Sequence, residues 1–473
     1  MTGHDRTGHD ATVHDATVHD APLPRVLGRR RHLHLVHVVL AAAVVASWLV
    51  QVHRGIDTAP AVVVAVLVLV VEVQIVLSLL DRPRVAPPGA VDHLEVVALV
   101  PCYNEDPTAL RACLRGFLTQ TRLPQAVVVV DDGSTDADYG EVRRWFVDEA
   151  PRRGVRGTWV RQENAGKRHA QVRGTVEEPG ADIYVTVDSD SILDRRALET
   201  GLAPFADPDV QSVAAVILTT NVATNLLTRV VDVYCASLNL FERAAFSRLG
   251  SVLVNSGGCA LYRGDILRDE VDTYLGETIA GRPVQFSDDS LLTLFALRRG
   301  KAVQQADCFA FTLMPDRFSH HRRQQLRWMR GSFIRSGWRL RFLPLHRTAY
   351  WLHLVKWLLY AATTATFAYV VASGHLADPV AAGSAVVGAL CLYTLTTLRY
   401  ATIVRSDRTW AQTMRTAALA PLAGAWSLTF LRVLRWYGMA TFLDTGWGTR
   451  GSVEVHSDDA DVDARHEPRT VTR

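Results

Sequence analysis

The chain has 473 residues, enough for two or three domain-sized units, and 48% of them are hydrophobic. That fraction is high for a soluble protein and indicates membrane segments combined with a globular part. The formal net charge is only +3, so the composition gives no reason to expect nucleic acid as a partner. The six cysteines have no CxxC spacing, which favours reduced, buried thiols over a zinc site or a disulfide framework.

The N-terminal region divides into a polar tail and an apolar hairpin. Residues 1–24 repeat His-Asp at five-residue intervals and are expected to be a disordered tail, with adventitious metal binding as the alternative. Two apolar runs follow, at 33–52 and 60–80, each about long enough to cross a bilayer. Arginines flank the pair on both outer sides. The positive-inside rule therefore predicts a transmembrane hairpin over residues 25–84, with both ends in the cytoplasm.

Residues 91–315 are predicted to form a soluble domain between membrane segments. Its apolar, β-branched runs are typical of strands buried on both faces of a sheet. Such strands are predicted at residues 95–100, 126–130, 183–187, 211–219 and 251–255. Charged, helical stretches separate the first three, and this alternation predicts an α/β sheet. Because the preceding hairpin returns to the cytoplasm, the domain is expected to lie there.

The C-terminal third is predicted to return to the membrane. Residues 316–345 are rich in Arg, Trp, Phe and Leu, and are expected to form amphipathic helices in the membrane interface. A C-terminal transmembrane region, residues 346–436, contains two predicted spans, at 350–373 and 379–398. Residues 437–473 complete the chain as a short segment and a polar, acidic tail expected to be disordered.

One apolar stretch of that region, residues 413–434, is interrupted by Pro421 and Gly424. Arginines flank it on both sides. The positive-inside rule therefore favours a re-entrant or interfacial hairpin over a fifth span.

Two ionisable residues, Glu72 and Lys356, fall within predicted spans. Such a placement is expensive and usually functional. At about 1.5 Å per residue, their depths from the cytoplasmic side are roughly 12 Å and 9 Å, which predicts an ion pair between them. In the alternative, Lys356 reaches the interface and Glu72 stays protonated.

The central candidate site is Asp188-Ser189-Asp190, which directly follows the strand predicted at 183–187. Ligands of open α/β sheets bind beyond the carboxyl ends of the strands. Two hard oxygen donors at that place suit Mg²⁺ or Mn²⁺, which would bridge to a diphosphate. An Asp-X-Asp pair alone is weak evidence, because most such pairs are solvated turns.

Four further motifs surround the central pair. Polar groups close the first two strands, a glycine turn is followed by two cations, a second carboxylate pair stands on a loop, and a Gln-x-x-Arg-Trp pattern comes last. The two strand ends are residues 100–105 and 131–136, and the other three motifs are residues 164–168, 286–289 and 324–328. Singly they could be turns, a solvated face, a helix N-cap and an interfacial anchor. Their joint order between membrane hairpins is hard to explain as chance and favours a nucleotide site, with Asp132 accepting from a uracil N–H and the cations facing a diphosphate.

These motifs resemble those of the processive, membrane-embedded family-2 glycosyltransferases, which have a GT-A catalytic domain. Cellulose, chitin and hyaluronan synthases share this plan, and the similarity is greatest to the bacterial hyaluronan synthases. It extends over roughly residues 91–450. The segments that carry it are residues 164–171, 187–191, 224–229, 242–245, 255–263, 324–328 and 447–450.

The resemblance implies a role for each matching residue. Asp132 and Lys167 would hold the UDP, and Asp188 would contact the nucleotide. Tyr103 and Glu105 would also bind substrate. Asp188 and Asp190 would ligate Mg²⁺ or Mn²⁺. Asp289 would be the general base for the acceptor hydroxyl, and Arg327 would offset charge on the leaving diphosphate. Gln324 and Trp328 would shape the acceptor site, and a gating segment would close over the nucleotide with Trp447, Thr449 and Arg450.

The implied activity is inverting, metal-dependent polymerisation of UDP-sugars, with export of the polysaccharide through the chain's own spans in the plasma membrane. Hyaluronan made from UDP-GlcNAc and UDP-GlcA is the favoured product. The alternatives are a chitin-oligosaccharide or other β-glycan synthase that uses one UDP-sugar, and a transporter or receptor with a degenerate nucleotide-binding domain. Membrane lipid is an expected partner, nucleic acid is not, and the oligomeric state is not predicted.

Two departures concern the acceptor side. Related synthases commonly have Pro where this chain has Gly258, and Arg where it has Ser290. Both positions lie near the acceptor in the resemblance, so they bear on which sugars are joined.

Overall fold

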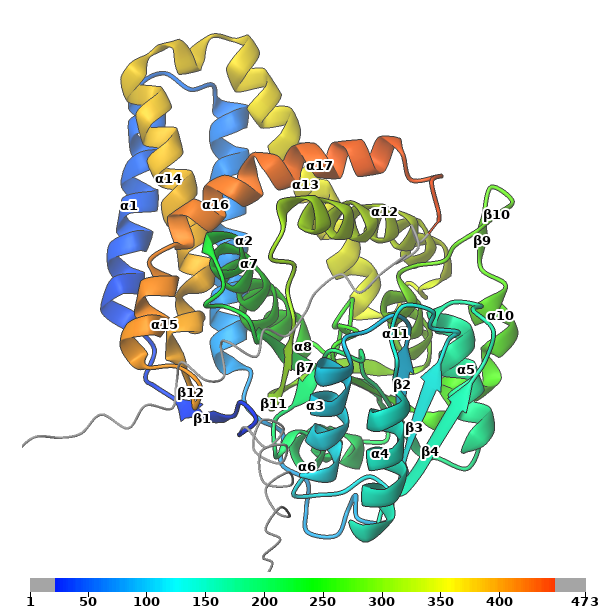
Figure 1. Ribbon diagram of the computed structural model, residues 1–473. Helices are drawn as coiled ribbons and strands as arrows, with labels where there is room; N and C mark the ends of the chain where they lie inside the picture. Colours follow the sequence, from blue (N-terminus) through cyan, green and yellow to red (C-terminus); the bar gives the residue numbers. More distant parts are fainter. Residues whose placement is uncertain (1–21, 447–473) are drawn as a thin grey trace, which may run out of the picture.

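An eight-stranded mixed sheet forms the centre of the soluble domain in the computed structural model, which describes residues 22–446 (Figure 1). The spatial order is β4-β3-β2-β5-β8-β7-β11-β6. The strands are β2 (Val96–Cys102), β3 (Ala126–Asp131), β4 (Arg156–Arg161), β5 (Ile183–Thr186), β6 (Ile192–Leu193), β7 (Val210–Thr219), β8 (Ala260–Arg263) and β11 (Lys301–Thr312). The first four in spatial order are parallel, β7 and β11 are parallel to each other, and β8 and β6 run antiparallel to their neighbours.

The predicted strands at 95–100, 126–130, 183–187 and 211–219 are confirmed, whereas the one at 251–255 is wrong. Ser251 makes only an isolated bridge to Ala302. The chain then leaves the sheet, because the Asn255 N–H donates to Thr293 Oγ1 on a helix rather than to a neighbouring strand. Strand β8, a few residues later, takes the place between β5 and β7.

Helices cover both faces of the sheet, and the alternation of side chains along each strand assigns them to two cores. In β2, Val96 and Val100 face the core shared with α3 (Pro107–Leu118), whereas Val97 and Leu99 face the core shared with α5. The first core also contains α4 (Gly140–Arg152) and α6 (Ala197–Leu202). The second contains α5 (Lys167–Glu177), α9 (Gly264–Asp269), α10 (Val271–Leu275) and α11 (Asp288–Arg299).

A second group of helices is long and apolar enough to cross a membrane. They are α1 (His34–His53), α2 (Thr58–Leu80), α13 (Thr348–Ala372) and α14 (Pro379–Thr397), which continues through a short 3-10 turn to Thr402. Their large apolar side chains face outward, as expected for lipid contact. Helix α1 packs along α14, where the Gln51 amide donates to the Ala381 carbonyl at 2.7 Å. Below this bundle, β1 (Val26–Arg29) pairs antiparallel with β12 (Ile403–Arg405).

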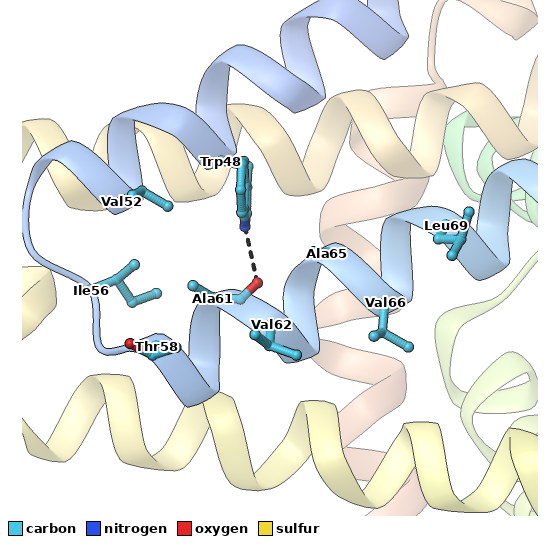
Figure 2. A pocket seen from close by; sticks show the side chains of 9 residues that line it. All are labelled: Trp48, Val52, Ile56, Thr58, Ala61, Val62, Ala65, Val66 and Leu69. Carbon is cyan, nitrogen blue, oxygen red and sulfur yellow. Dashed lines mark hydrogen bonds between the residues drawn. The ribbon is translucent and has the colours of Figure 1, made fainter.

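A groove lies between α1 and α2, near the loop that joins them (Figure 2). Its volume is about 400 Å³. The Trp48 indole closes one side by donating to the Ala61 carbonyl at 3.0 Å. The lining is almost wholly apolar and lies in the hairpin, away from the sheet (Figure 1). Its position and chemistry are those of a lipid-facing groove rather than of a site for a polar substrate.

The region between the sheet and the bundle contains long and broken helices. Residues 316–345 form one helix, α12 (Phe318–Phe342), and its position in a membrane interface stays a prediction. The stretch Trp410–Ala440 is long and apolar enough for a fifth span but consists of three helices: α15 (Trp410–Ala417), α16 (Ala420–Leu428) and α17 (Phe430–Ala440). Pro421 lies in the first turn of the second, and α17 runs across the direction of α14 in Figure 1. A re-entrant or interfacial arrangement stays a prediction.

The soluble domain reaches the bundle through a bent helix. Helix α7 (Leu226–Ser237) continues into a π-helical turn, η2 (Leu238–Arg243), and then into α8 (Ala244–Arg248). An Asn225–Thr228 capping box begins it, because the Asn225 side chain accepts from the Thr228 N–H. A short hairpin of two antiparallel strands with two residues each, β9 (Thr278–Ile279) and β10 (Arg282–Pro283), precedes α11.

The predicted Glu72–Lys356 ion pair is wrong. Glu72 Oε2 lies 3.1 Å from His37 Nε2 on α1, and Lys356 Nζ donates to Glu242 Oε1 at 2.5 Å. Helices α2 and α13 are indeed neighbours. However, depth along the membrane normal does not specify the direction in which a side chain points, and Lys356 meets a partner from the soluble domain's π-helical turn.

The Lys356–Glu242 pair gives a testable consequence for stability. Glu242→Lys and Lys356→Glu should each lower the melting temperature of the detergent-solubilised protein, because each leaves two like charges in contact. The double variant should recover most of the loss, with a coupling of about 0.5–3 kcal/mol. Glu72→Lys combined with Lys356→Glu is the matched control and should show no coupling. Additive losses in the Glu242 pair would contradict the contact.

Candidate active site

Strands β3, β2 and β5 are parallel neighbours, so their carboxyl ends meet at one edge of the sheet. The three motifs that follow them are joined there by hydrogen bonds. Ser189 Oγ donates to Glu105 Oε2 at 2.9 Å, and the Thr135 and Asp136 N–H groups donate to Asn104 Oδ1, each at 2.9 Å. The structure therefore brings these three motifs together at one edge of the sheet, and their sharing of one functional site stays a prediction.

The Asp132 carboxylate organises the glycine turn before α5. Its Oδ1 accepts from Gln162 Nε2 at 2.7 Å and from the Ala165 N–H at 3.0 Å, and its Oδ2 accepts from the Gly166 N–H at 2.8 Å. Asp132 is buried. In this geometry it holds the loop that presents Lys167, and contact between Asp132 and a uracil base stays a prediction.

Lys167 is the point where three distant parts of the chain meet. Its Nζ lies 2.5 Å from Asp188 Oδ1 and 3.0 Å from Asp288 Oδ2. Burial by itself would lower the pKa of Lys167, but the two carboxylates more than offset it and raise that pKa well above its usual value. Burial alone would raise the pKa of Asp288. The neighbouring Lys167 ammonium group outweighs burial and keeps that pKa below its usual value.

The glycine at position 257 permits this approach. A Cβ there would lie 2.8 Å and 3.1 Å from the Asp188 carboxylate oxygens and 3.2 Å from Lys167 Nζ. The Asp188 N–H also donates to the Gly257 carbonyl at 3.0 Å. Backbone, cation and carboxylate thus share a space too small for a side chain at this position.

Asp289 lies in the first turn of α11, beside Asp288. Its Oδ1 accepts from the Ser290 N–H at 2.7 Å. Burial and the Asp288 carboxylate raise the pKa of Asp289 to about 7, and Lys167 partly opposes them. The two adjacent carboxyl groups therefore differ: Asp288 is ionised and paired with Lys167, whereas Asp289 can exchange a proton near neutral pH.

The Gln-x-x-Arg-Trp residues lie on α12, which contacts α11. The Gln324 Oε1 atom is buried and has no hydrogen-bond partner among the described residues. Arg327 is half-buried, and Trp328 is exposed. Tyr103 is half-buried on the loop after β2. Trp447, Thr449 and Arg450 lie outside the described residues.

Asp188 and Asp190 are the predicted metal ligands, and both are half-buried at the end of β5. Asp190 Oδ1 lies 3.3 Å from both the Ser191 and the Thr312 hydroxyls. Across residues 22–446, no group of three or more His, Cys, Asp or Glu side chains could hold a metal ion. Two carboxylates suit Mg²⁺ or Mn²⁺ when a substrate's phosphate oxygens supply further ligands, so this donor set fits a metal that arrives with a diphosphate.

Sequence reasoning missed several residues of this region. It gave no role to Asp288, Gly257, Glu277 or Arg335. The glycine pair at 257–258 was a usable signal, because such pairs mark close backbone approach. Glu277 and Arg335 gave none, since a lone Glu before a hairpin and one Arg among many on α12 are indistinguishable from solvated charges.

The sheet and the carboxylates at its edge define the class of protein, a GT-A nucleotide-sugar transferase. A solved mannosyltransferase from Pyrobaculum calidifontis, in complex with GDP-Man and Mn²⁺, shares the fold with a TM-score of 0.50 and 23% identity. That match covers 82% of this chain and 99% of the mannosyltransferase chain. The sequence model of glycosyl transferase family 2 matches residues 97–270.

Comparison with related sequences identifies the family within this class of transferases. The chain is 30% identical to a hyaluronan synthase from Streptococcus pyogenes over 372 residues, which is 78% of this chain and 86% of the relative. It is 33% identical to an N-acetylglucosaminyltransferase from Rhizobium sp. (strain N33), covering 53% of this chain and 55% of that protein. The chain belongs to glycosyltransferase family 2, as a membrane-bound homologue of the hyaluronan synthases.

Proposed function

We propose that this enzyme joins UDP-GlcNAc and UDP-GlcA into hyaluronan and passes the polymer across the plasma membrane from a cytoplasmic catalytic domain. The observation that carries the proposal is the meeting of Lys167, Asp188 and Asp288 beside Asp289, in a chain similar to a hyaluronan synthase over most of its length. The arginines outside the first hairpin support the cytoplasmic orientation.

In this proposal the donor lies across the carboxyl ends of β3, β2 and β5. Tyr103, Glu105 and the loop held by Asp132 flank the nucleotide, and Lys167 faces its diphosphate. Asp188 and Asp190 would hold Mg²⁺ or Mn²⁺, which when bound neutralises charge on the diphosphate. Asp188 and Asp288 hold the Lys167 ammonium group at the strand ends where the diphosphate would lie.

On the acceptor side, Asp289 removes the proton from the attacking hydroxyl. That oxygen forms the new bond to the anomeric carbon while the bond from this carbon to the diphosphate oxygen breaks, with inversion. Arg327 faces the charge that develops on UDP, and Gln324 and Trp328 position the acceptor sugar. The buried Gln324 Oε1, which has no hydrogen-bond partner within residues 22–446, supports this because such an atom can accept from a sugar hydroxyl. A gating role for Trp447, Thr449 and Arg450 stays part of the proposal.

The pKa of Asp289 makes the proposal testable by pH. A general base must be ionised, and burial with Asp288 nearby raises the pKa of Asp289 to about 7. Polymer synthesis, measured as kcat/KM for the acceptor end, should fall about tenfold per pH unit below that value, as expected for loss of a single required base. Asp288→Asn should move the midpoint downward, because it removes a neighbouring negative charge. A rate that stays flat from pH 8 to pH 5.5 would contradict the assignment.

The donor requirement tests the product. Membranes containing the enzyme receive UDP-GlcNAc, UDP-GlcA or both, with released UDP and polymer measured. Hyaluronan synthesis requires both donors and yields a product degraded by hyaluronidase. The second candidate, a chitin-oligosaccharide synthase, is favoured by the similarity to the rhizobial N-acetylglucosaminyltransferase and needs UDP-GlcNAc alone. No UDP release with any donor would support the transporter or receptor alternative.

A further inference from the structure

A buried charge cluster lies behind the proposed base, and the reaction as described gives it no role. Its members are Glu277, Arg168, Arg335 and Trp338. Glu277 Oε1 accepts from Arg335 Nη1 at 2.6 Å and from the Trp338 indole at 2.7 Å. Glu277 Oε2 accepts from Arg168 Nη2 at 2.7 Å and from Arg335 Nη2 at 3.0 Å. The carboxylate therefore holds two guanidinium groups at once.

The members of the cluster come from three separate parts of the chain. Arg168 is adjacent to Lys167 at the start of α5 and also donates to the Phe286 carbonyl at 2.8 Å. Arg335 and Trp338 lie on α12, the helix that carries Gln324 and Arg327. Glu277 thus joins the donor-side helix to the acceptor-side helix.

Arg335 also donates hydrogen bonds to the base loop, which consists of Ser287 and the first turn of α11 that carries Asp289. Its Nε donates to Ser290 Oγ at 3.2 Å and its Nη2 to the Ser287 carbonyl at 3.4 Å. Arg335 has no exposed surface. Ser290 directly follows Asp289, and the guanidinium beside it comes from α12. Ser287 has a φ of +62°, a left-handed conformation that costs a serine energy and that surrounding contacts must hold.

The backbone of α12 meets the same loop one turn earlier. A Cβ at Gly331 would lie 2.1 Å from Ser287 Oγ and 2.9 Å from Ser287 Cβ. Side-chain bonds from Arg335 and a glycine contact at Gly331 therefore fix the distance between α12 and the base loop.

We propose that Glu277 and Arg335 are positioning residues that hold the Asp289 loop in register with Lys167 on α5 and Arg327 on α12. The inference rests on the proposed role of Asp289. Two buried cations around one carboxylate are weak evidence for stability, because burying charges costs about as much as their attraction returns. Their directional bonds instead specify one geometry, and a misplacement of about 1 Å can cost 10²-fold in rate.

The test uses two kinds of variant in the full-length, detergent-solubilised enzyme. Arg335→Lys keeps the charge but cannot make the two-pronged contact to Glu277. Gly331→Ala pushes on Ser287 without altering any charge. Gly337→Ala is the matched control, since it lies on the same helix and a Cβ there meets nothing within 4 Å. UDP affinity, polymer kcat and melting temperature are measured for each.

We expect Arg335→Lys and Gly331→Ala to lower kcat by about 10²-fold while UDP affinity stays within about twofold. Gly337→Ala should match the parent enzyme. Adding Ser287→Gly to Gly331→Ala should restore much of kcat, because it removes the colliding side chain and suits the left-handed φ. Unchanged kcat in both test variants, or equal losses of kcat and UDP affinity, would overturn the positioning role.

Asp289→Asn, measured in parallel, separates this inference from the proposed function. If Asp289→Asn still makes polymer, the base assignment itself fails. If Asp289→Asn is inactive while Arg335→Lys and Gly331→Ala are normal, only the positioning role fails.

Discussion

Asp289→Asn should stop polymer growth while leaving UDP binding nearly intact. The variant keeps the shape of the side chain but cannot accept a proton, and loss of a general base typically costs about 10²–10⁴-fold in rate. Binding should survive because Lys167, which would face the diphosphate, pairs with the neighbouring Asp288 carboxylate in the first turn of α11. Polymer synthesis and UDP affinity, measured on the same preparation, check both parts.

Asp288→Asn is the matched neighbour for this experiment. It removes the carboxylate that lies 3.0 Å from Lys167 Nζ, so its effect should fall on donor binding and on the pH midpoint. If Asp289→Asn weakens UDP binding as much as it weakens synthesis, Asp289 belongs to the nucleotide site and another group is the base.

Asp190→Asn is expected to abolish metal-dependent transfer while the protein still inserts into the membrane. An amide is a far poorer ligand than a carboxylate for Mg²⁺ or Mn²⁺. A metal at a diphosphate supplies several kcal/mol of charge stabilisation, so the loss should be about 10²-fold or more. UDP release at graded Mn²⁺ concentrations measures it.

A control close in space keeps this experiment interpretable. Thr312→Val removes the hydroxyl that lies 3.3 Å from Asp190 Oδ1 but leaves the carboxylate, and should retain most activity. Near-normal transfer by Asp190→Asn at ordinary Mn²⁺ concentrations would remove Asp190 from the metal site.

Local features of the sequence determined the architecture. A strand buried on both faces is a continuous apolar run, and a membrane span is a longer one, so four of the five predicted strands and the apolar helices could be recognised without tertiary information. The carboxylates at 188–190 could be assigned to a site for the same reason. The end of a parallel strand is a place that the sequence itself marks.

Which side chains meet depends on how distant parts of the chain pack together. Lys167 and Asp288 are more than a hundred residues apart, and no local pattern states that one ammonium group lies between Asp188 and Asp288. The same limit explains the wrong partner for Lys356, whose position along a helix was readable but whose direction was not.

The buried cluster at Glu277 shows this limit most plainly. In the sequence Glu277, Arg168 and Arg335 are single charges, and single charges are usually solvated. In the folded chain these three residues are buried and hydrogen-bonded to one another. A buried charge is stable only when it is paired, and the packing of the chain determines which partners are close enough. The amino-acid sequence therefore predicts the fold class and the edge of the sheet where chemistry is expected, whereas packing decides which side chains lie together at that edge.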